Sequence, residues 1–200
     1  MTEPEVFVLA DQAINEVVAQ IRDDQWAMPM PPSFARRQTD TVPTLREVVG
    51  YHAYDDAWVP DMLAGRTMDE VGKDKFKGDL LGDDPKRSFA AIVDKAVAAA
   101  RAVTDLERTV HTSFGDFTTR EYFYQTNMFR GLRARDIARV IGYPMTLPAE
   151  LVQGIWDEIQ PHAEEWRAIG VFAKAVPVPD GAPLLDRLLG LTGRDPNAID

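Results

Sequence analysis

The chain of 200 residues contains no cysteine. This absence excludes a disulfide framework, a zinc ion bound by cysteine and a catalytic thiolate supplied by the chain itself. Any thiol chemistry would therefore need a thiol from outside the protein. A chain without cysteine also suits a reducing compartment, so we expect a cytoplasmic protein.

Basic residues are scarce as well. The chain has 22 Lys and Arg against 32 Asp and Glu, which gives a net charge of -10. Such an acidic protein repels nucleic-acid phosphates and anionic lipids, so we expect neither nucleic acid nor a membrane as a partner. No Lys or Arg precedes Arg22, and no apolar run approaches the roughly 20 residues needed to cross a bilayer. We therefore expect neither an export signal nor a membrane-spanning helix.

Several well-defined motifs are missing too. The sequence has no GxGxxG, P-loop, GxSxG, HExxH or EF-hand pattern. Nucleotide binding, serine-dependent acyl hydrolysis and calcium binding therefore have no support from motifs. The histidines lie in different segments, which gives little basis for a metal site.

What the sequence does contain is helical periodicity over most of its length. Thr-x-x-Glu capping boxes at Thr2, Thr44 and Thr118 mark helix starts, and Asp84 followed by Pro85 marks another. Apolar residues at helical spacing follow each of these signals. The predicted helices cover 3–22, 44–64, 85–103, 118–141 and 148–168, the last with a bend at Pro161.

The connections between these helices contain proline, glycine and charge. Prolines between Trp26 and Pro43 prevent a regular helix, so this stretch is predicted to be a long ordered connection anchored by Trp26 and Phe34. Residues 65–84 mix glycine and charge without a lasting period and are predicted to form a surface loop.

A small β-hairpin is predicted before the fourth long helix. Residues 108–118 place β-branched and aromatic side chains on both sides of a turn at Gly115-Asp116. Residues 171–194 are predicted to form a Pro-rich strap and a short helix stopped by Gly190. The whole chain, 1–200, is thus predicted to be a single all-α domain with one hairpin and additional C-terminal helices.

His52 is the first candidate for a functional residue. It shares the inward stripe of the predicted helix 44–64 with aliphatic residues. A core histidine bonded to a backbone carbonyl or to Asp56 would satisfy this position. Alternatively, an imidazole beside a carboxylate acts as a general base or as a metal ligand.

Arg133 is the second candidate, because it interrupts the predicted inward stripe of helix 118–141. The other members of that stripe are Tyr122, Thr126, Phe129, Ile137 and Val140. An ion pair with Asp136, Asp56 or Asp55 would satisfy the charge. Alternatively, the guanidinium binds the carboxylate of a small anionic or thiol-bearing ligand, with Asp56 and Thr126 beside it. His111 and His162 are weaker candidates, and each is interpreted as structural.

The order of several short segments resembles a known family. LREVVGYHAYDDAW lies in helix 44–64, RDIARVIG ends helix 118–141, LVQGIWDEI follows, and the tail reads PVPDGAPLLDRLLGLTGRDP. Together with the hairpin, this is similar to the actinobacterial branch of DinB-like proteins of the mycothiol-dependent maleylpyruvate isomerase type. The resemblance covers nearly the whole chain. It implies an up-down-down-up four-helix bundle, a homodimer, a divalent metal and a low-molecular-weight thiol such as mycothiol.

The metal set of that family is incomplete in this chain. In the family, one ligand is a histidine at the position of His52, and two more lie four residues apart on the later helix. Here those two positions hold Phe129 and Arg133, and neither side chain offers a lone pair to a metal. The resemblance therefore leaves His52 as a single potential ligand and places a fixed positive charge near the family's metal position.

Two functions follow from the resemblance. The first is a thiol-dependent isomerase or transferase in which His52 acts as base or orienter and Arg133 holds a substrate carboxylate. The second is a non-catalytic member that binds a small ligand or a protein partner.

Overall fold

The computed structural model describes residues 1–31 and 42–197. Most of these residues are helical, as predicted, and the predicted anchor Phe34 lies outside the described residues. Within the same residues, none of the helices has both the length and the apolar character needed to cross a membrane.

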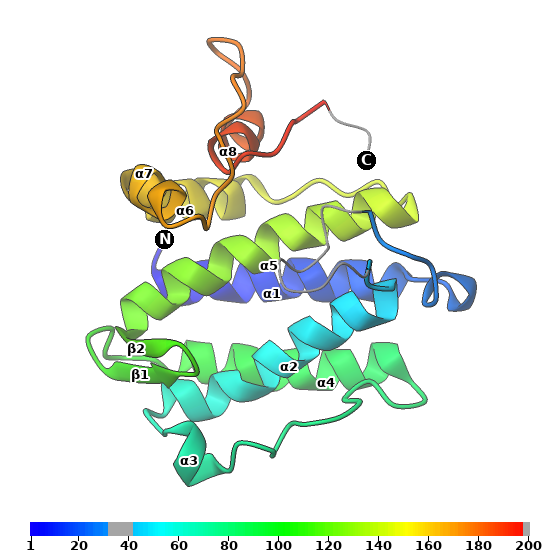
Figure 1. Cartoon of the computed structure of the whole chain (residues 1–200), viewed down its shortest axis with the longest axis vertical. Coiled ribbons are helices and arrows are strands. Elements are labelled where there is room, and N and C mark those ends of the chain that lie inside the picture. The colour runs from blue at the N-terminus through cyan, green and yellow to red at the C-terminus, as the bar shows by residue number, and fades with distance from the viewer. Residues whose placement is uncertain (32–41, 198–200) are drawn as a thin grey trace.

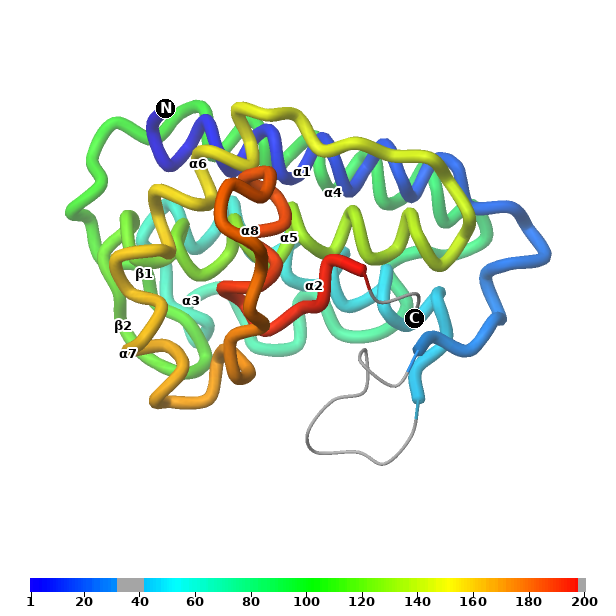
Figure 2. Tube along the Cα trace, turned by 90° about the horizontal axis from the view of Figure 1, so that it is seen from above, coloured from blue at the N-terminus to red at the C-terminus, as the bar shows by residue number. Residues whose placement is uncertain are grey.

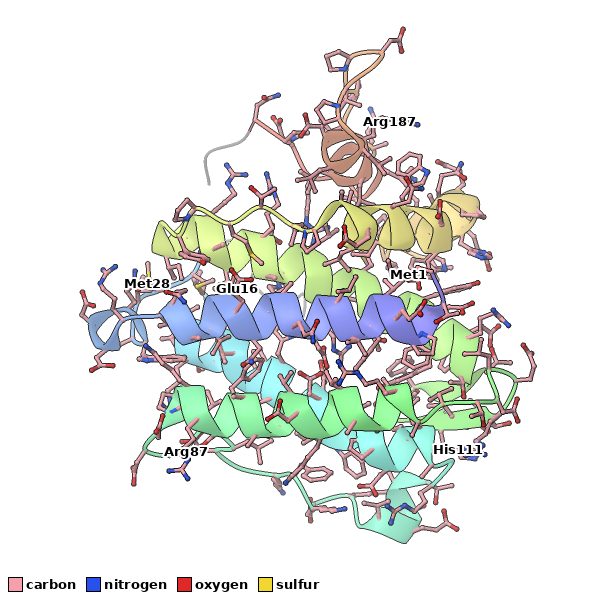
Figure 3. All side chains as sticks on the ribbon, turned by 180° about the vertical axis from the view of Figure 1, so that it is seen from behind. Met1, Glu16, Met28, Arg87, His111 and Arg187 are labelled. Atoms are coloured by element: carbon pink, nitrogen blue, oxygen red, sulfur yellow. The ribbon has the colours of Figure 1, made fainter. Side chains whose placement is uncertain are left out.

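Four long helices form the body of the molecule (Figure 1). They are α1 (Glu3–Gln20), α2 (Leu45–Leu63), α4 (Pro85–Arg101) and α5 (Thr119–Ile141). Helix α1 packs against both α4 and α5, and α2 packs against α4. Helices α1 and α5 run in one direction and α2 and α4 in the opposite one, as the positions of Met1, Glu16 and Arg87 in Figure 3 help to show.

The helix starts follow from the predicted capping residues. At the start of α2, the Thr44 hydroxyl accepts the Glu47 backbone N–H at 3.3 Å, and the Glu47 carboxylate accepts the Thr44 backbone N–H at 2.7 Å. The same reciprocal pair forms between Thr118 and Glu121 at the start of α5. Each box satisfies backbone donors that a helix terminus leaves without an intrahelical partner.

The core fills the space between these helices. Its largest fully buried side chains come from α1, α2, α4, α5 and α6 and from the loop before α4; among them are Phe7, Ile14, Leu45, Leu81, Phe89, Phe123, Met128, Leu132, Ile137, Leu151 and Ile155. Burial of this apolar surface is the main favourable contribution to folding.

The hairpin and one short helix lie at one end of the body (Figure 1). Strands β1 (Thr109–Thr112) and β2 (Gly115–Thr118) pair antiparallel, as predicted. The predicted turn at Gly115-Asp116 is wrong: the turn is at residues 113–114, and Asp116 pairs with His111 inside the ladder. The predicted surface loop 65–84 also contains a short helix, α3 (Met68–Val71), which begins at a further Thr67–Glu70 capping box.

The C-terminal part covers the side of α5 that faces away from α2 and α4 (Figures 1 and 2). Pro161 divides the predicted helix 148–168 into α6 (Ala149–Ile159), a turn of 3-10 helix η3 (Gln160–His162) and α7 (Ala163–Ala168). Close approach of α6 requires glycine, because a Cβ at Gly131 of α5 would lie 2.6 Å from Ile155 and one at Gly154 would lie 2.5 Å from Val6.

The last helix, α8 (Leu184–Leu191), packs on α6. Gly190 does not stop it, contrary to the prediction: Gly190 lies inside the helix, where its carbonyl accepts the Val176 N–H of the strap at 2.9 Å. The chain leaves the helix at Gly193, which has a φ of 82°.

A buried carboxyl fixes α6 to the beginning of the body. Glu158 is 7% exposed, and its two oxygens lie 2.9 and 3.1 Å from the Asn127 side-chain nitrogen, which also donates to the Glu3 carbonyl at 3.0 Å. Burial raises the pKa of Glu158 to about 8, and Glu3 and Asp157 add to the rise while Asn127 opposes it. The carboxyl is therefore mostly protonated at neutral pH.

This raised pKa predicts a pH-dependent stability. Because the pKa of Glu158 rises from 4.5 to about 8 on folding, its contribution is complete below pH 4.5 and is lost as the pH rises through 8. Relative to Glu158→Gln, the wild-type protein should lose about 1–3 kcal/mol of unfolding free energy between pH 5.5 and pH 8.5. Denaturant unfolding at both pH values measures this difference. Glu150→Gln, on the exposed side of the same helix, should follow the wild type, and identical pH profiles for all three proteins would refute the assignment.

Candidate functional site

The candidate site is built next to a buried guanidinium on α5. Arg130 is 3% exposed. Its Nε donates to Asp56 Oδ1 at 2.8 Å, and its Nη2 donates to the same oxygen. Its Nε also lies 2.7 Å from Asp11 Oδ1. The guanidinium carbon lies 4.8 Å from the centre of the Phe7 ring, at a distance typical of a cation–π contact.

This group, which we call the Arg130 triad, consists of Arg130, Asp11 and Asp56 and joins α5 to α1 and α2. Both carboxyl groups are fully buried. Neither oxygen of Asp11, nor Oδ2 of Asp56, has a hydrogen-bond partner among residues 1–31 and 42–197. Nε and Nη2 of Arg130 thus donate to a single oxygen of Asp56, and Nη1 donates to the Thr126 carbonyl at 3.4 Å, while Asp11 contacts the cation without an aligned hydrogen bond.

The Arg130 triad has one positive group and two carboxyl groups, all of them buried. Burial raises the pKa of Asp11 well above its ordinary range, and the nearby Asp56 adds to the rise. Burial alone would lower the pKa of Arg130, but Asp56 and Asp11 raise it above its ordinary value. Burial raises the pKa of Asp56 as well, although Arg130 opposes that rise. Since the Arg130 hydrogen bonds go to Asp56 and none goes to Asp11, we assign the proton to Asp11, which gives an ionised Arg130–Asp56 pair beside a neutral acid.

A cavity of about 330 Å³ lies next to the Arg130 triad. It is enclosed by α2, α5, the turn of the hairpin and the region around α3. Arg130 reaches its wall, while the other lining side chains are His52, Tyr54, Asp55, Trp58, Met62, Met68, Thr112, Ser113, Phe114, Tyr122, Gln125, Thr126 and Phe129. The size of the cavity and its mixture of aromatic, methionine and polar side chains are typical of a small-molecule site.

His52 is positioned on this wall by the α2 helix. Burial lowers its pKa well below the ordinary value, and the positive charges of Arg133 and Arg130 lower it further. His52 is therefore a neutral imidazole at physiological pH, with one nitrogen that donates and one that accepts. Such a group orients a ligand by hydrogen bonds, and it also accepts a proton.

The structure separates the residues that the sequence grouped together. His52 and Thr126 both line the cavity, whereas Asp56 is fully buried behind it and bonded to Arg130. Arg133 is partly buried and does not belong to the described lining of the cavity. Burial lowers the pKa of Arg133, and Asp136 opposes that shift.

Other predicted residues lie elsewhere. Phe129 was predicted to point into the core, but its side chain is 44% exposed. His111 forms a 2.8 Å contact with Asp116 on the hairpin. His162 stacks between Tyr124 and Trp166. Neither of these histidines lines the described cavity.

Neither Arg130 nor Asp11 was predicted as a site residue, although the sequence carries a signal for each. Asp11 follows Phe7 by four residues and precedes Ile14 by three, so it lies on the buried stripe of α1. Arg130 likewise falls between the buried residues Asn127 and Ala134 of α5. Charged residues on two facing stripes predict a buried ion pair.

The donor set does not fit the metal centre that the family resemblance implies. Of the three positions, only His52 offers a metal ligand, since Phe129 and Arg133 have no free lone pair. Over residues 1–31 and 42–197, His, Asp and Glu side chains form no group of three that would hold a metal ion. The described side chains at these positions thus offer a metal ion His52 alone.

No family model, curated protein or solved structure matches the chain.

The proton assignment in the Arg130 triad leads to a prediction for asparagine variants. Asp11→Asn replaces a neutral acid by a neutral amide, so it should lower the unfolding free energy by less than about 1 kcal/mol at pH 7. The double variant Asp11→Asn with Asp56→Asn leaves Arg130 without a counter-ion, so it should lower the unfolding free energy by about 3–5 kcal/mol. The loss of unfolding free energy in Asp56→Asn alone should lie between these two values, because Asp11 can then ionise and pair with Arg130. Denaturant unfolding measures all three, and a single Asp11→Asn change as costly as the double change would contradict the assignment.

Proposed function

We propose that this chain is a DinB-like protein of the maleylpyruvate isomerase type whose cavity beside His52 binds a small molecule. The order of LREVVGYHAYDDAW, RDIARVIG and the LLGLTGRDP tail supports the family. The directions of the four long helices support it as well, since α1 runs up, α2 and α4 run down, and α5 runs up. The hairpin that precedes α5 adds further support.

The observation that carries the proposal is the cavity of about 330 Å³ with a neutral imidazole on its wall. Its volume lies within the range of small-molecule pockets, and half of its lining residues are polar or charged while the others are aromatic or methionine. Binding of a compact molecule fits this arrangement better than binding of a protein, because the cavity lies between α2, α5 and the hairpin.

A second candidate is a thiol-dependent isomerase or transferase. The neutral state of His52 favours it, because a neutral imidazole can take the proton of a thiol that enters with the substrate. In this candidate the thiol is an external one such as mycothiol, since the chain has no cysteine. Arg133 lies outside the described lining of the cavity, so in this candidate the substrate carboxylate would extend beyond the cavity to reach it.

The proposed binding site predicts ligand stabilisation that depends on His52. A ligand at about 100 times its Kd raises the unfolding free energy by about 2.7 kcal/mol, which a thermal melt detects. A panel of mycothiol, small carboxylates and uncharged aromatic compounds should contain members that raise Tm. His52→Leu should weaken their binding about tenfold through lost hydrogen bonds.

His162→Leu is the matched control, because His162 stacks on Trp166 and does not line the described cavity. It should keep the wild-type ligand response. Since His52 stays neutral, binding should also be unchanged between pH 8 and pH 6. Equal loss of binding in both variants, or no response of the wild-type protein to the whole panel, would argue against this site. Turnover of a thiol and a carboxylate substrate that disappears in Arg133→Met would favour the enzyme.

A further inference from the structure

Part of the cavity wall comes from a segment that has few contacts with the body of the molecule. Residues 67–77 contain the short helix α3, and Met68 of this helix lines the cavity. No residue of α3 is buried. Figure 1 shows α3 outside the four long helices. A segment with few buried contacts opens at a lower free energy than the core does.

The backbone of this segment is bonded to itself. The N–H groups of Val71, Gly72 and Lys75 all donate to carbonyls within residues 67–77. A glycine with positive φ stands near each end, Gly65 at 73° and Gly78 at 109°. Glycine tolerates large changes of φ and ψ, so these two positions are suited to act as hinges. The segment can therefore move without losing its internal hydrogen bonds.

One ion pair joins the segment to the body. Lys75 Nζ lies 2.8 Å from Oδ2 of Asp61, which is 3% exposed near the end of α2. Arg66, just before the segment, pairs with the other oxygen of the same carboxylate. Among the hydrogen bonds and ion pairs of residues 1–31 and 42–197, the Lys75–Asp61 contact is the one that links residues 67–77 to the rest of the chain.

The same ion pair positions an aromatic contact at the cavity wall. The Lys75 ammonium lies 4.9 Å from the centre of the Phe76 ring. Phe76 in turn packs edge-on against Trp58, with 5.0 Å between ring centres. Trp58 lines the cavity and is 2% exposed. Release of Lys75 from Asp61 would therefore loosen Phe76 from the outer side of the wall.

Building on the proposed binding function, we infer that residues 67–77 form a lid of the cavity, which the Lys75–Asp61 ion pair keeps closed. In the closed state the lid contributes Met68 to the wall and packs Phe76 on Trp58. In the open state the ion pair is broken, and a small molecule has a wider entrance. Closure of such a lid shields a bound molecule from water.

Cleavage by chymotrypsin after Phe76 tests the lid without any ligand. When opening and closing are fast, the cleavage rate follows the population of the open form. Lys75→Gln removes the ion pair at a half-exposed side chain, so it should raise this rate about three- to tenfold. Each rate is divided by that of the matching peptide of residues 70–82, which corrects for the changed sequence beside the cleavage site.

Lys73→Gln is the matched control, because Lys73 pairs with Asp69 at 2.9 Å inside the lid itself. It should keep the wild-type rate. Asp61→Asn removes the ion pair from the side of the body and should be cleaved at least as fast as Lys75→Gln.

Equal cleavage rates in the wild-type protein and Lys75→Gln would overturn the inference. A fall in the unfolding free energy of Lys75→Gln that matches its faster cleavage would overturn it as well, because global unfolding would then explain the cleavage. Both results would leave the binding function in place, since the melting-temperature screen with His52→Leu tests that function separately.

Discussion

The ion pair between Arg130 and Asp56, with Asp11 beside it, is the constraint on which the rest of the structure depends. It connects α5 to α2 and α1 inside an otherwise apolar body, and both carboxyl groups are fully buried. A buried charge without compensation would cost several kcal/mol, so the three side chains have to meet. These contacts fix the rotation of α5 about its own axis. They thereby determine which α5 residues face the core and which face the cavity.

The same interaction sets the chemistry of the cavity. Because Arg130 is compensated from behind, its charge is not left free for a ligand. His52 remains neutral, since burial and two nearby arginines disfavour its protonation. What remains on the wall is a set of aromatic and methionine side chains, several uncharged polar groups and the Asp55 carboxyl. A positive charge in the sequence of a pocket-forming helix therefore does not by itself indicate an anion site.

The sequence predicted the long helices well, because capping boxes and apolar periodicity are local properties of the chain. The candidate site was harder to predict. On α5, Arg130 and Arg133 differ by only about 60° on the helical wheel. This helix packs against α1, α6 and the hairpin, so buried residues occur around much of its circumference and no single stripe is defined. The choice of Arg133 as the inward residue, and of Phe129 with it, followed from that ambiguity. Gly190 was wrongly predicted to end the last helix for a related reason. Its glycine allows close contact with the strap, and that contact is a tertiary feature that the local sequence does not reveal.

The most direct test of the account is the protonation state of Asp11. In a 13C NMR titration of the aspartate carboxyl carbons, we expect one signal at the position of a protonated carboxyl at pH 7, and we expect that signal to be absent from Asp11→Asn. A spectrum in which all aspartates are ionised at pH 7 would give the Arg130 triad a net negative charge. That result would contradict the neutral environment from which the properties of the cavity are derived.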